Sequence, residues 1–350
     1  MAKKKICFAA QFPPPIHGLT KAVDTLYNST LEREFDFEKV NLTDNRKFLF
    51  NVLKILFSSA DVFYFTISQT PGGNKRDLLL LWLFRLKKKK CLIHLHGGYY
   101  RTMVDTELSS HQRKANYKAL SKVDGAIVLS SNLKSIFEGM VPSERIWVVS
   151  NCVDDEYVGK TENGYLNPSG SVHRVLYLSN FIRSKGYRDV LELALMEKEK
   201  KNGFVFDFAG NFFDKEEKVF FENYVATHEL QDLVTYHGVV SGEKKSKLLE
   251  DSDVLVLLTR YPKEGQPISI LEAMANGLAV VSTDHAAIPD MIKDDENGVL
   301  VKQGMSIADI YDRMINLDFK AVSKANRQLV NQKYRQSMYI DAMKEIFEEV

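Results

Sequence analysis

Residues 253–283 read DVLVLLTRYPKEGQPISILEAMANGLAVVST, and the order of elements in this stretch points to one fold class. Two apolar runs, Asp253–Thr259 and Leu278–Thr283, have the length of strands and flank a helix-like segment, Ile268–Asn276. Pro267 suits the first position of that helix, and the glycine that follows it suits the C-terminal end. Because both runs are continuously apolar rather than alternating, they indicate parallel strands covered on both faces. The stretch is therefore predicted to be one strand–loop–helix–strand unit of a doubly wound sheet.

The same alternation of apolar strand-like runs with helix-length segments extends along the whole chain. The other runs are Ile6–Phe12, Val62–Ser68, Cys91–His96, Gly125–Ser130, Ile146–Val149, Arg174–Asn180, Phe204–Gly210 and Val234–Gly238. The sequence therefore predicts an α/β protein with two doubly wound, parallel-sheet, Rossmann-like domains.

A chain of 350 residues exceeds the size at which one hydrophobic core usually stops growing, so two domains are expected. The segment 154–172 is rich in glycine and has little apolar periodicity, which favours a linker. We predict an N-terminal domain over 1–155 and a C-terminal domain over 156–330. A C-terminal helix is expected over 318–349, and its last part, about 331–350, is a candidate to pack on the first domain.

Cysteine usage and the apolar runs favour a cytoplasmic protein. The three cysteines, Cys7, Cys91 and Cys152, are far apart and lie in or beside apolar runs, which suits reduced, buried thiols rather than disulfides or a metal site. The apolar stretch near the N-terminus ends at three prolines, too early for a signal-peptide core. The run Leu78–Phe84 is too short to span a bilayer, so no transmembrane segment is expected.

The net charge of +1 hides a division between the two halves. Residues 1–150 contain 23 Lys and Arg against 13 Asp and Glu, a net charge of +10, whereas residues 151–350 contain 24 against 33, a net charge of −9. Within 45–104 there are eleven basic residues against Asp61 and Asp77. Such asymmetry suggests an anionic surface as a partner of the first half.

The loop and helix inside 259–277 are the strongest candidates for a ligand site. The free N–H groups and the positive dipole end of the helix point back at the loop, which makes an anion site suited to a phosphate. Glu264 lies just before the helix and Glu272 lies within it, so the two carboxylates could address two parts of one extended ligand. The alternative is a solvated loop glutamate and an ordinary helical glutamate, and the residues alone favour neither.

A second candidate is the loop after the strand-like run 174–180. Arg183, Lys185 and Gly186 precede a helix predicted over Tyr187–Met196, so two cations and a flexible backbone lie at the carboxyl end of a strand. Such cations can neutralise a diphosphate leaving group. Loop lysines and arginines are commonly just solvated, and for this segment alone that alternative is favoured.

These segments together resemble a known family. The chain has EGQPISILEAMANG at 264–277, then AVV at 279–281 and IPD at 288–290. It also has KG at 185–186, AG at 209–210, VSNCVD at 149–154 and FPPPIHG at 12–18. This pattern resembles the retaining glycosyltransferases of family four that build bacterial cell-surface polysaccharides. The resemblance covers most of the chain, and the two-glutamate segment is its most specific part.

The resemblance implies a GT-B fold, in which two Rossmann-like domains face a cleft that holds a nucleotide sugar. It implies that Glu272 binds the ribose hydroxyls, Glu264 the donor sugar hydroxyls, and Lys185 the diphosphate. It also implies donor contacts from Gly210 and from the backbone of Gly265, Gln266, Pro267 and Ile268. Cationic side chains would take the role of a metal, so neither a metal ion nor another cofactor is expected.

One position departs from the family pattern. Counting back from Lys185, the family's phosphate-binding arginine falls on Asn180, which carries no charge. Arg183, three residues further on, is the candidate to replace it.

Two segments of the first half suit the acceptor side of the cleft that the resemblance implies. In the segment 13–18 the prolines stiffen a strand-to-helix loop, His17 could contact acceptor or phosphate, and Gly18 permits close backbone approach. Strand alternation puts His94 and His96 on the same sheet face. The resemblance makes His96 a catalytic-site contact to the donor sugar, whereas for His94 a buried, hydrogen-bonded histidine is favoured.

The predicted function is that of a metal-independent, hexosyltransferase-like enzyme. It would move a sugar from a nucleotide-diphosphate donor, a UDP-sugar, to a glycan or lipid-linked acceptor, as a peripheral protein on the inner face of the cytoplasmic membrane. The run Leu78–Phe84 with the lysines after it could instead be a buried helix whose last turn complements its dipole. The rival functions are a sugar-nucleotide epimerase or hydrolase on the same fold, and a non-catalytic sugar-nucleotide-binding subunit. The basic stretch lacks a nucleic-acid-binding motif, so no nucleic acid is expected.

Overall fold

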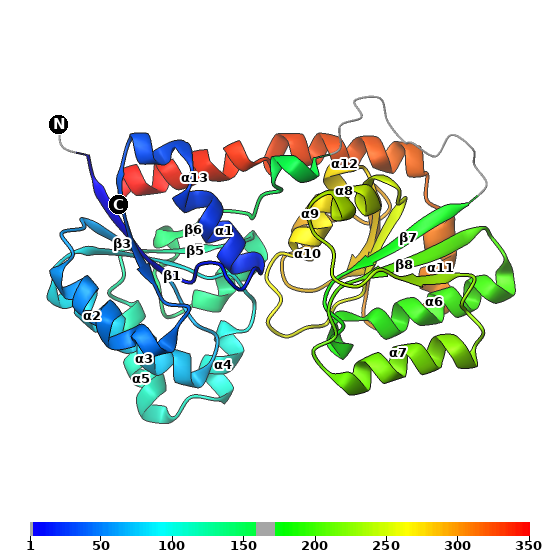
Figure 1. Ribbon diagram of the computed structural model, residues 1–350. Coiled ribbons are helices and arrows are strands. Elements are labelled where there is room, and N and C mark those ends of the chain that lie inside the picture. Colours follow the sequence, from blue (N-terminus) through cyan, green and yellow to red (C-terminus); the bar gives the residue numbers. More distant parts are fainter. Residues whose placement is uncertain (1–2, 159–171) are drawn as a thin grey trace. The chain divides into compact units, whose positions relative to one another are not determined.

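The computed structural model describes residues 3–158 and 172–350 and divides into two compact units (Figure 1). Unit 1 consists of Met1–Asn151 with Ser337–Val350, and unit 2 of Cys152–Gln336. Most of the expected linker, residues 159–171, lies outside the described residues. Among the described helices, none is both long and apolar enough to cross a bilayer.

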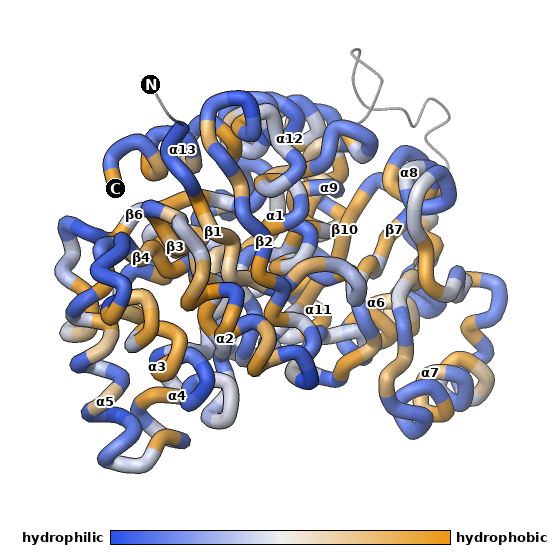
Figure 2. Tube along the Cα trace, turned by 60° about the vertical axis from the view of Figure 1, so that its left-hand side comes forward, coloured by the Kyte–Doolittle hydropathy of each residue, from blue (hydrophilic) through white to orange (hydrophobic). Residues whose placement is uncertain are grey.

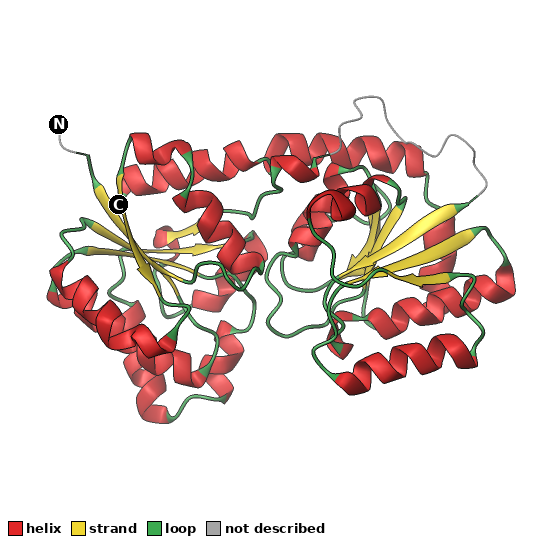
Figure 3. Ribbon diagram, in the orientation of Figure 1, coloured by secondary structure: helices red, strands yellow, loops and turns green. Residues whose placement is uncertain are grey.

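Unit 1 is a six-stranded parallel sheet in the order β2-β1-β3-β4-β5-β6 (Figure 3). The strands are β1 Lys5–Ala10, β2 Asp36–Asn41, β3 Val62–Thr66, β4 Lys90–His94, β5 Gly125–Val128 and β6 Ile146–Val148. The helices are α1 Gly18–Tyr27, α2 Phe48–Phe57, α3 Pro71–Leu86, α4 Tyr100–Thr106, α5 Ser110–Leu120 and α13 Gln336–Glu349.

Aromatic side chains hold the two helical layers of unit 1 against the sheet. On one face Phe8 and Tyr64, which are paired in register, lie 6.1 and 6.0 Å from the ring of Phe347 on α13. On the other face Phe63 stacks on Phe84 of α3 at 4.3 Å. Side chains alternate along a strand, so the consecutive residues Phe63 and Tyr64 of β3 point to opposite faces of the sheet. Phe63 contacts the α3 layer and Tyr64 contacts the α13 layer.

Unit 2 is a second six-stranded parallel sheet, in the order β12-β11-β10-β7-β8-β9. The strands are β7 His173–Leu178, β8 Phe204–Ala209, β9 Val234–Tyr236, β10 Val254–Leu257, β11 Ala279–Thr283 and β12 Gly298–Val301. The helices are α6 Tyr187–Lys200, α7 Lys215–Thr227, α8 Gly242–Glu250, α9 Ile268–Ala275, α10 Ile288–Met291, α11 Ile307–Ile315 and α12 Phe319–Lys333. Figure 1 shows α6, α7 and α11 on one face of this sheet and α8, α9 and α12 on the other.

The predicted doubly wound α/β class and its ten parallel strands are confirmed, with strand ends shifted by up to two residues. Two strands, β2 and β12, were not predicted. β2 has the polar sequence DFEKVN, and β12 has only four residues. Both are edge strands, and β2, which has one neighbouring strand and is mostly exposed, needs less apolar surface than the central strands, whereas β12 is apolar but short.

Three helix predictions are corrected by the structure. The predicted helix over 318–349 is two helices, α12 and α13, because the helix is interrupted at Tyr334 and Arg335. The helix that begins at Tyr187 continues to Lys200, four residues beyond its expected end. Pro267 is the N-cap of α9 rather than its first residue, whereas Gly277 has the left-handed conformation expected of a glycine after a helix end, with φ +80°.

Candidate functional site

The strand order of unit 2 brings the two predicted loops together. β7 and β10 are hydrogen-bonded neighbours although they are far apart in sequence, so the loops that follow their carboxyl ends are adjacent. The loop after β7 contains a single 3-10 turn, Arg183–Lys185, and then Gly186 with φ +82°. A Cβ on Gly186 would lie 2.3 Å from the carbonyl oxygen of Leu258, so only glycine allows the turn to approach the end of β10 this closely.

Lys185 and Glu264 form a largely buried ion pair in this region. Lys185 Nζ lies 2.5 Å from Glu264 Oε2, and the Thr259 hydroxyl donates a hydrogen bond to the same oxygen at 3.0 Å. The ammonium also lies 4.9 Å from the ring centroid of Tyr261. Glu264 is only 7% exposed, so the alternative of a solvated loop glutamate is wrong.

Glu272 forms a second buried ion pair, on α9. Its carboxylate is 2.6 Å from Lys245 Nζ on α8, and Lys245 lies 4.1 Å from the ring centroid of Tyr157. Glu272 is 1% exposed, so the alternative of an ordinary amphipathic-helix glutamate is also wrong. Burying two charges is costly unless they are paired, and both carboxylates have a lysine partner.

In the sequence, the N-terminus of α9 lies between Glu264 and Glu272, the carboxylates of these two pairs. Gly265, Gln266 and Pro267 are buried, and the Gly265 carbonyl oxygen accepts a hydrogen bond from Ala287 N at 3.1 Å, which fixes the loop. The first turn of α9 carries no acidic residue, so the positive end of the helix dipole is not offset there. The predicted anion site at Gly265–Ile268 is therefore built from an anchored backbone.

Gly210 has a clear structural requirement. It follows β8, its φ is +153°, and a Cβ there would lie 1.9 Å from the Ser179 carbonyl oxygen. The glycine is needed for the loop after β8 to approach the loop after β7. A donor contact from Gly210 stays a prediction.

In unit 1 the predicted histidines form one cluster on the α1 and α13 side of the sheet. The rings of His94 and His96 lie 3.9 Å apart, which confirms that they share a face. His94 Nδ1 is 2.7 Å from the Tyr64 hydroxyl, but its Nε2 and both ring nitrogens of His96 are buried with no hydrogen-bond partner among the described residues. Burial, and secondarily the nearby His17, lowers the pKa of His96 to about 3, so its ring is neutral at physiological pH.

His17 and Gly18 lie where the sequence predicts them, at the start of α1. His17 is the N-cap residue, and its backbone N donates to the Thr20 hydroxyl at 3.0 Å. Burial lowers the pKa of His17 below its usual value, so this ring too favours the neutral form. Contacts of His17 and Gly18 with acceptor or phosphate stay predictions.

Residues 160–336, half of the chain and nearly all of unit 2, match the family described as Glycosyl transferases group 1. The chain belongs to this family. The resemblance inferred from the two-glutamate segment is therefore confirmed.

Two curated relatives are named for the biosynthesis of amylovoran and of colanic acid. The amylovoran biosynthesis glycosyltransferase AmsK of Erwinia amylovora is 28% identical over 183 residues, which is 50% of this chain and 44% of AmsK. The putative colanic acid biosynthesis glycosyltransferase WcaL of Escherichia coli K12 is 28% identical over 134 residues, 37% of this chain and 32% of WcaL. The match thus spans less than half the length of these two relatives.

The fold is similar to that of solved structures over nearly the whole chain. HepE of Anabaena, solved in complex with UDP, superposes with a TM-score of 0.77 at 14% sequence identity, covering 99% of this chain and all of HepE. This likeness confirms the predicted GT-B fold.

One residue of the candidate site was not found from the sequence, namely Lys245. It lies on a polar helix with the sequence GEKKSKLLE, where nothing separates it from the solvated lysines beside it. Only the tertiary contact between α8 and α9 makes it the partner of Glu272.

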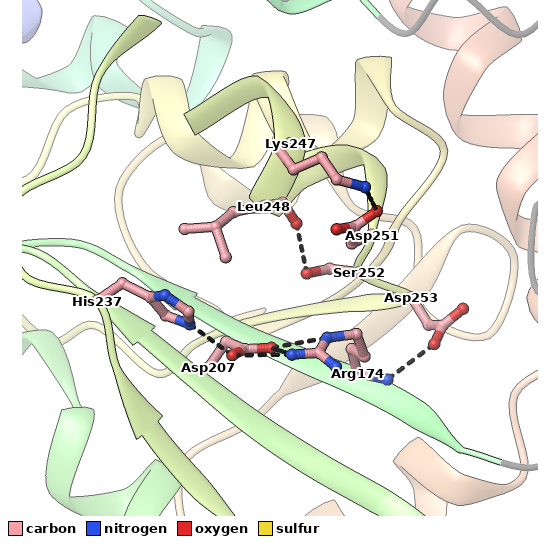
Figure 4. Close-up of polar contacts among 8 residues, drawn as sticks. All are labelled: Arg174, Asp207, His237, Lys247, Leu248, Asp251, Ser252 and Asp253. Atoms are coloured by element: carbon pink, nitrogen blue, oxygen red, sulfur yellow. Dashed lines mark hydrogen bonds and ion pairs between the residues drawn. The ribbon is translucent and has the colours of Figure 1, made fainter. Parts of the chain in front are cut away.

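A third buried carboxylate, Asp207 on β8, has a structural role. Figure 4 shows it between Arg174 and His237, with Arg174 Nε at 3.0 Å and His237 Nε2 at 2.6 Å. The Arg174 backbone N in turn donates to Asp253 Oδ2 at 2.8 Å. The network ties β7, β8 and the ends of their neighbours together.

The expectation that the protein needs no metal ion stays a prediction. Within residues 3–158 and 172–350, no three or more His, Cys, Asp or Glu side chains are grouped so that they could hold a metal ion. The three cysteines are all buried, as expected.

Arg183 and Asn180 are both exposed on the loop after β7. If Arg183 supplies the charge that is missing at Asn180, Arg183→Ala should lower turnover about tenfold or more, because a charge-assisted contact to phosphate is lost. Steady-state kinetics with saturating donor measure this. The matched variant Arg183→Ala with Asn180→Arg should recover turnover, and unchanged turnover in Arg183→Ala would remove Arg183 from the site.

Proposed function

We propose that this chain is a retaining glycosyltransferase that transfers a sugar from a UDP-sugar to a glycan or lipid-linked acceptor in surface-polysaccharide assembly. The observation that carries the proposal is the buried Lys185–Glu264 pair beside the N-terminus of α9, together with Glu272 of the same helix, which is paired with Lys245 of α8. The UDP bound in HepE and the biosynthetic names of AmsK and WcaL support the donor and acceptor classes.

The chemistry of such a transfer is chiefly electrostatic. Departure of the nucleoside diphosphate leaves positive charge on the anomeric carbon and negative charge on the leaving phosphate. An ammonium group has three N–H donors, and Glu264 takes one of those of Lys185, so two remain for phosphate oxygens. The backbone N–H groups at the start of α9 would add to the same stabilisation.

Glu264 has two roles in this proposal. Its Oε2 accepts hydrogen bonds from the Lys185 ammonium and the Thr259 hydroxyl, which fixes the ammonium. Its Oε1 would accept a hydrogen bond from a hydroxyl of the donor sugar. Glu272 is proposed to accept the ribose hydroxyls, with Lys245 holding its carboxylate in place. Retention of configuration and independence of metal ions rest on the family resemblance, and so does a donor-sugar contact from His96.

Thermal-shift screening against a panel of nucleotide sugars tests the proposed donor. UDP-sugars are expected to stabilise the protein most, by about 2.7 kcal/mol at 100 times the dissociation constant. Panel members with other nucleotides are the matched controls, and equal shifts with all of them would remove the preference for uridine.

The rival functions differ from a transferase in turnover. An epimerase or hydrolase would consume donor without any acceptor, and a non-catalytic subunit would bind donor without turnover on any acceptor. Donor consumption that depends on an added glycan or lipid-linked acceptor is expected for the transferase.

We also propose that the basic first half brings the protein to an anionic membrane surface, the inner face of the cytoplasmic membrane. The +10 charge of residues 1–150 supports this. The lysines after α3 contribute less to the attraction for an anionic membrane than their number suggests, because three of them have partners. Lys87 donates a hydrogen bond to the Leu56 carbonyl oxygen at 2.6 Å, Lys89 pairs with Asp61, and Lys90 pairs with Asp124.

A further inference from the structure

Helix α2 of unit 1 presents most of its large apolar side chains to solvent. Its sequence is FLFNVLKILF, and only Asn51 and Ile55 are buried. Leu49 and Phe57 are 78% and 85% exposed, and Phe50 and Leu53 are more than half exposed. Figure 2 shows α2 and α3 coloured as hydrophobic over much of their length. Single exposed apolar residues are ordinary, but a contiguous row of them marks an interaction surface.

The neighbouring helix α3 extends this row. Leu79, Trp82 and Leu86 are exposed and recur at intervals of three and four residues, so they form one stripe on the helix. α2 and α3 cover the same side of the sheet in Figure 1, and Lys87 at the end of α3 bonds to Leu56 of α2. These exposed side chains of the two helices form the α2–α3 apolar face, which consists of Leu49, Phe50, Leu53, Phe57, Leu79, Trp82 and Leu86.

A basic pocket lies beside this face. It has a volume of about 510 Å³, lies between α3 and α5, and has apolar walls that include Leu78, Leu81 and Trp82. Trp82 belongs both to the pocket and to the α2–α3 apolar face, so the two are continuous. The cations of the pocket are Arg85, Lys88, Lys89, Lys118 and Lys122, of which Lys89 is paired with Asp61 at 3.3 Å. The one acidic residue of the pocket, Asp124, is paired with Lys90 at 3.0 Å.

We infer that the α2–α3 apolar face inserts into the acyl-chain region of an anionic bilayer, with the phosphate of one lipid held in the pocket between α3 and α5. An amphipathic helix that lies in the bilayer interface buries one apolar face and keeps cations at the headgroups, and this arrangement matches α2 and α3. The inference deepens the membrane part of the proposed function and does not depend on the donor site.

The charges favour a bilayer over the other occupants of such a face. A second copy of the chain would bring the same five pocket cations against one another, and like charges repel. An anionic bilayer supplies apolar depth and negative headgroups together. Attachment by charge alone should be lost at high salt, whereas insertion of apolar side chains should keep part of the binding.

Vesicle co-sedimentation of the full chain tests the inference. Vesicles of phosphatidylglycerol with phosphatidylcholine are compared with phosphatidylcholine alone, at about 0.1 M and about 1 M salt, where the Debye length is ~10 Å and ~3 Å. Binding to the anionic vesicles should persist in part at the higher salt. The double variant Phe57→Ser with Leu86→Ser should weaken it at least about tenfold at both salts, because two apolar anchors are lost.

Matched variants separate this face and pocket from general surface effects. Phe213→Ser with Val239→Ser removes two apolar side chains of unit 2 that are each 71% exposed, and should leave vesicle binding unchanged. Lys118→Gln in the pocket should reduce the preference for anionic vesicles, whereas Lys114→Gln, on α5 but outside the pocket lining, should not. With Trp147→Phe, Trp82 is the only tryptophan, and its fluorescence should be quenched by lipids brominated in their acyl chains.

Three results would overturn the inference. Complete release by salt together with normal binding of Phe57→Ser with Leu86→Ser would mean attachment by charge alone. Equal losses for the unit 2 control would mean that the face is not specific. A dimer in the absence of vesicles that Phe57→Ser disrupts would make a second copy the occupant. Failure of every nucleotide sugar to bind would refute the transferase proposal and leave this one standing.

Discussion

Lys185→Ala is expected to lower turnover at least about a hundredfold, because stabilising the charge of the leaving diphosphate is worth about 3 kcal/mol. Lys185 is the cation that the structure brings to Glu264, at 2.5 Å, on the loop next to the N-terminus of α9. Single-turnover kinetics with saturating donor and acceptor measure the chemical step directly. Lys263→Ala, which removes an exposed lysine one residue before Glu264, is the matched control and should keep turnover.

A stability measurement separates this catalytic effect from damage to the fold. Lys185→Ala leaves the buried Glu264 without its cation, and breaking a buried pair from one side costs about 3–5 kcal/mol. Lys185→Met with Glu264→Gln removes both charges and should recover most of the unfolding free energy without recovering turnover. Near-normal turnover in a folded Lys185→Ala protein would contradict the proposed role.

The central strands could be predicted because each is covered on both faces. Val254–Leu257 and Ala279–Thr283, for example, are fully buried, and such strands require continuous apolar sequence. β2 gives no such signal, since only one of its six residues, Val40, is buried. The apolar pattern therefore misses the polar edge strand β2, although the edge strands β6 and β9 were predicted.

The candidate site could be predicted only in part. Glu264, Glu272 and Lys185 were found because they lie in loops and helices that follow strands, where parallel sheets bind ligands. Their burial and their partners could not be predicted, because the pairs Lys185–Glu264 and Glu272–Lys245 join residues that are 79 and 27 positions apart. Whether a carboxylate is solvated or paired depends on such tertiary contacts rather than on its neighbours in sequence.

The two glutamates should differ in the ligand that their variants fail to bind. Glu272→Gln is expected to weaken binding of free UDP about tenfold or more, since a hydrogen bond to a charged group contributes roughly 1.5–3 kcal/mol. Glu264→Gln should leave UDP affinity nearly unchanged and weaken the intact UDP-sugar. Isothermal titration calorimetry with both ligands measures this, and equal losses on both ligands for both variants would contradict the assignment.

A ligand that lacks a ribose hydroxyl gives a more specific test of the role of Glu272. If its carboxylate accepts the ribose hydroxyls, the wild-type protein should bind UDP more tightly than 2′-deoxy-UDP, and Glu272→Gln should lose that discrimination, because the group that reads the hydroxyl is gone. Lys245→Met is the companion variant: Lys245 holds the carboxylate at 2.6 Å, so its loss should weaken both nucleotides while part of the discrimination remains. Discrimination that survives intact in Glu272→Gln would mean that another group binds the ribose, and Glu272 would then have only the structural role of pairing α9 with α8.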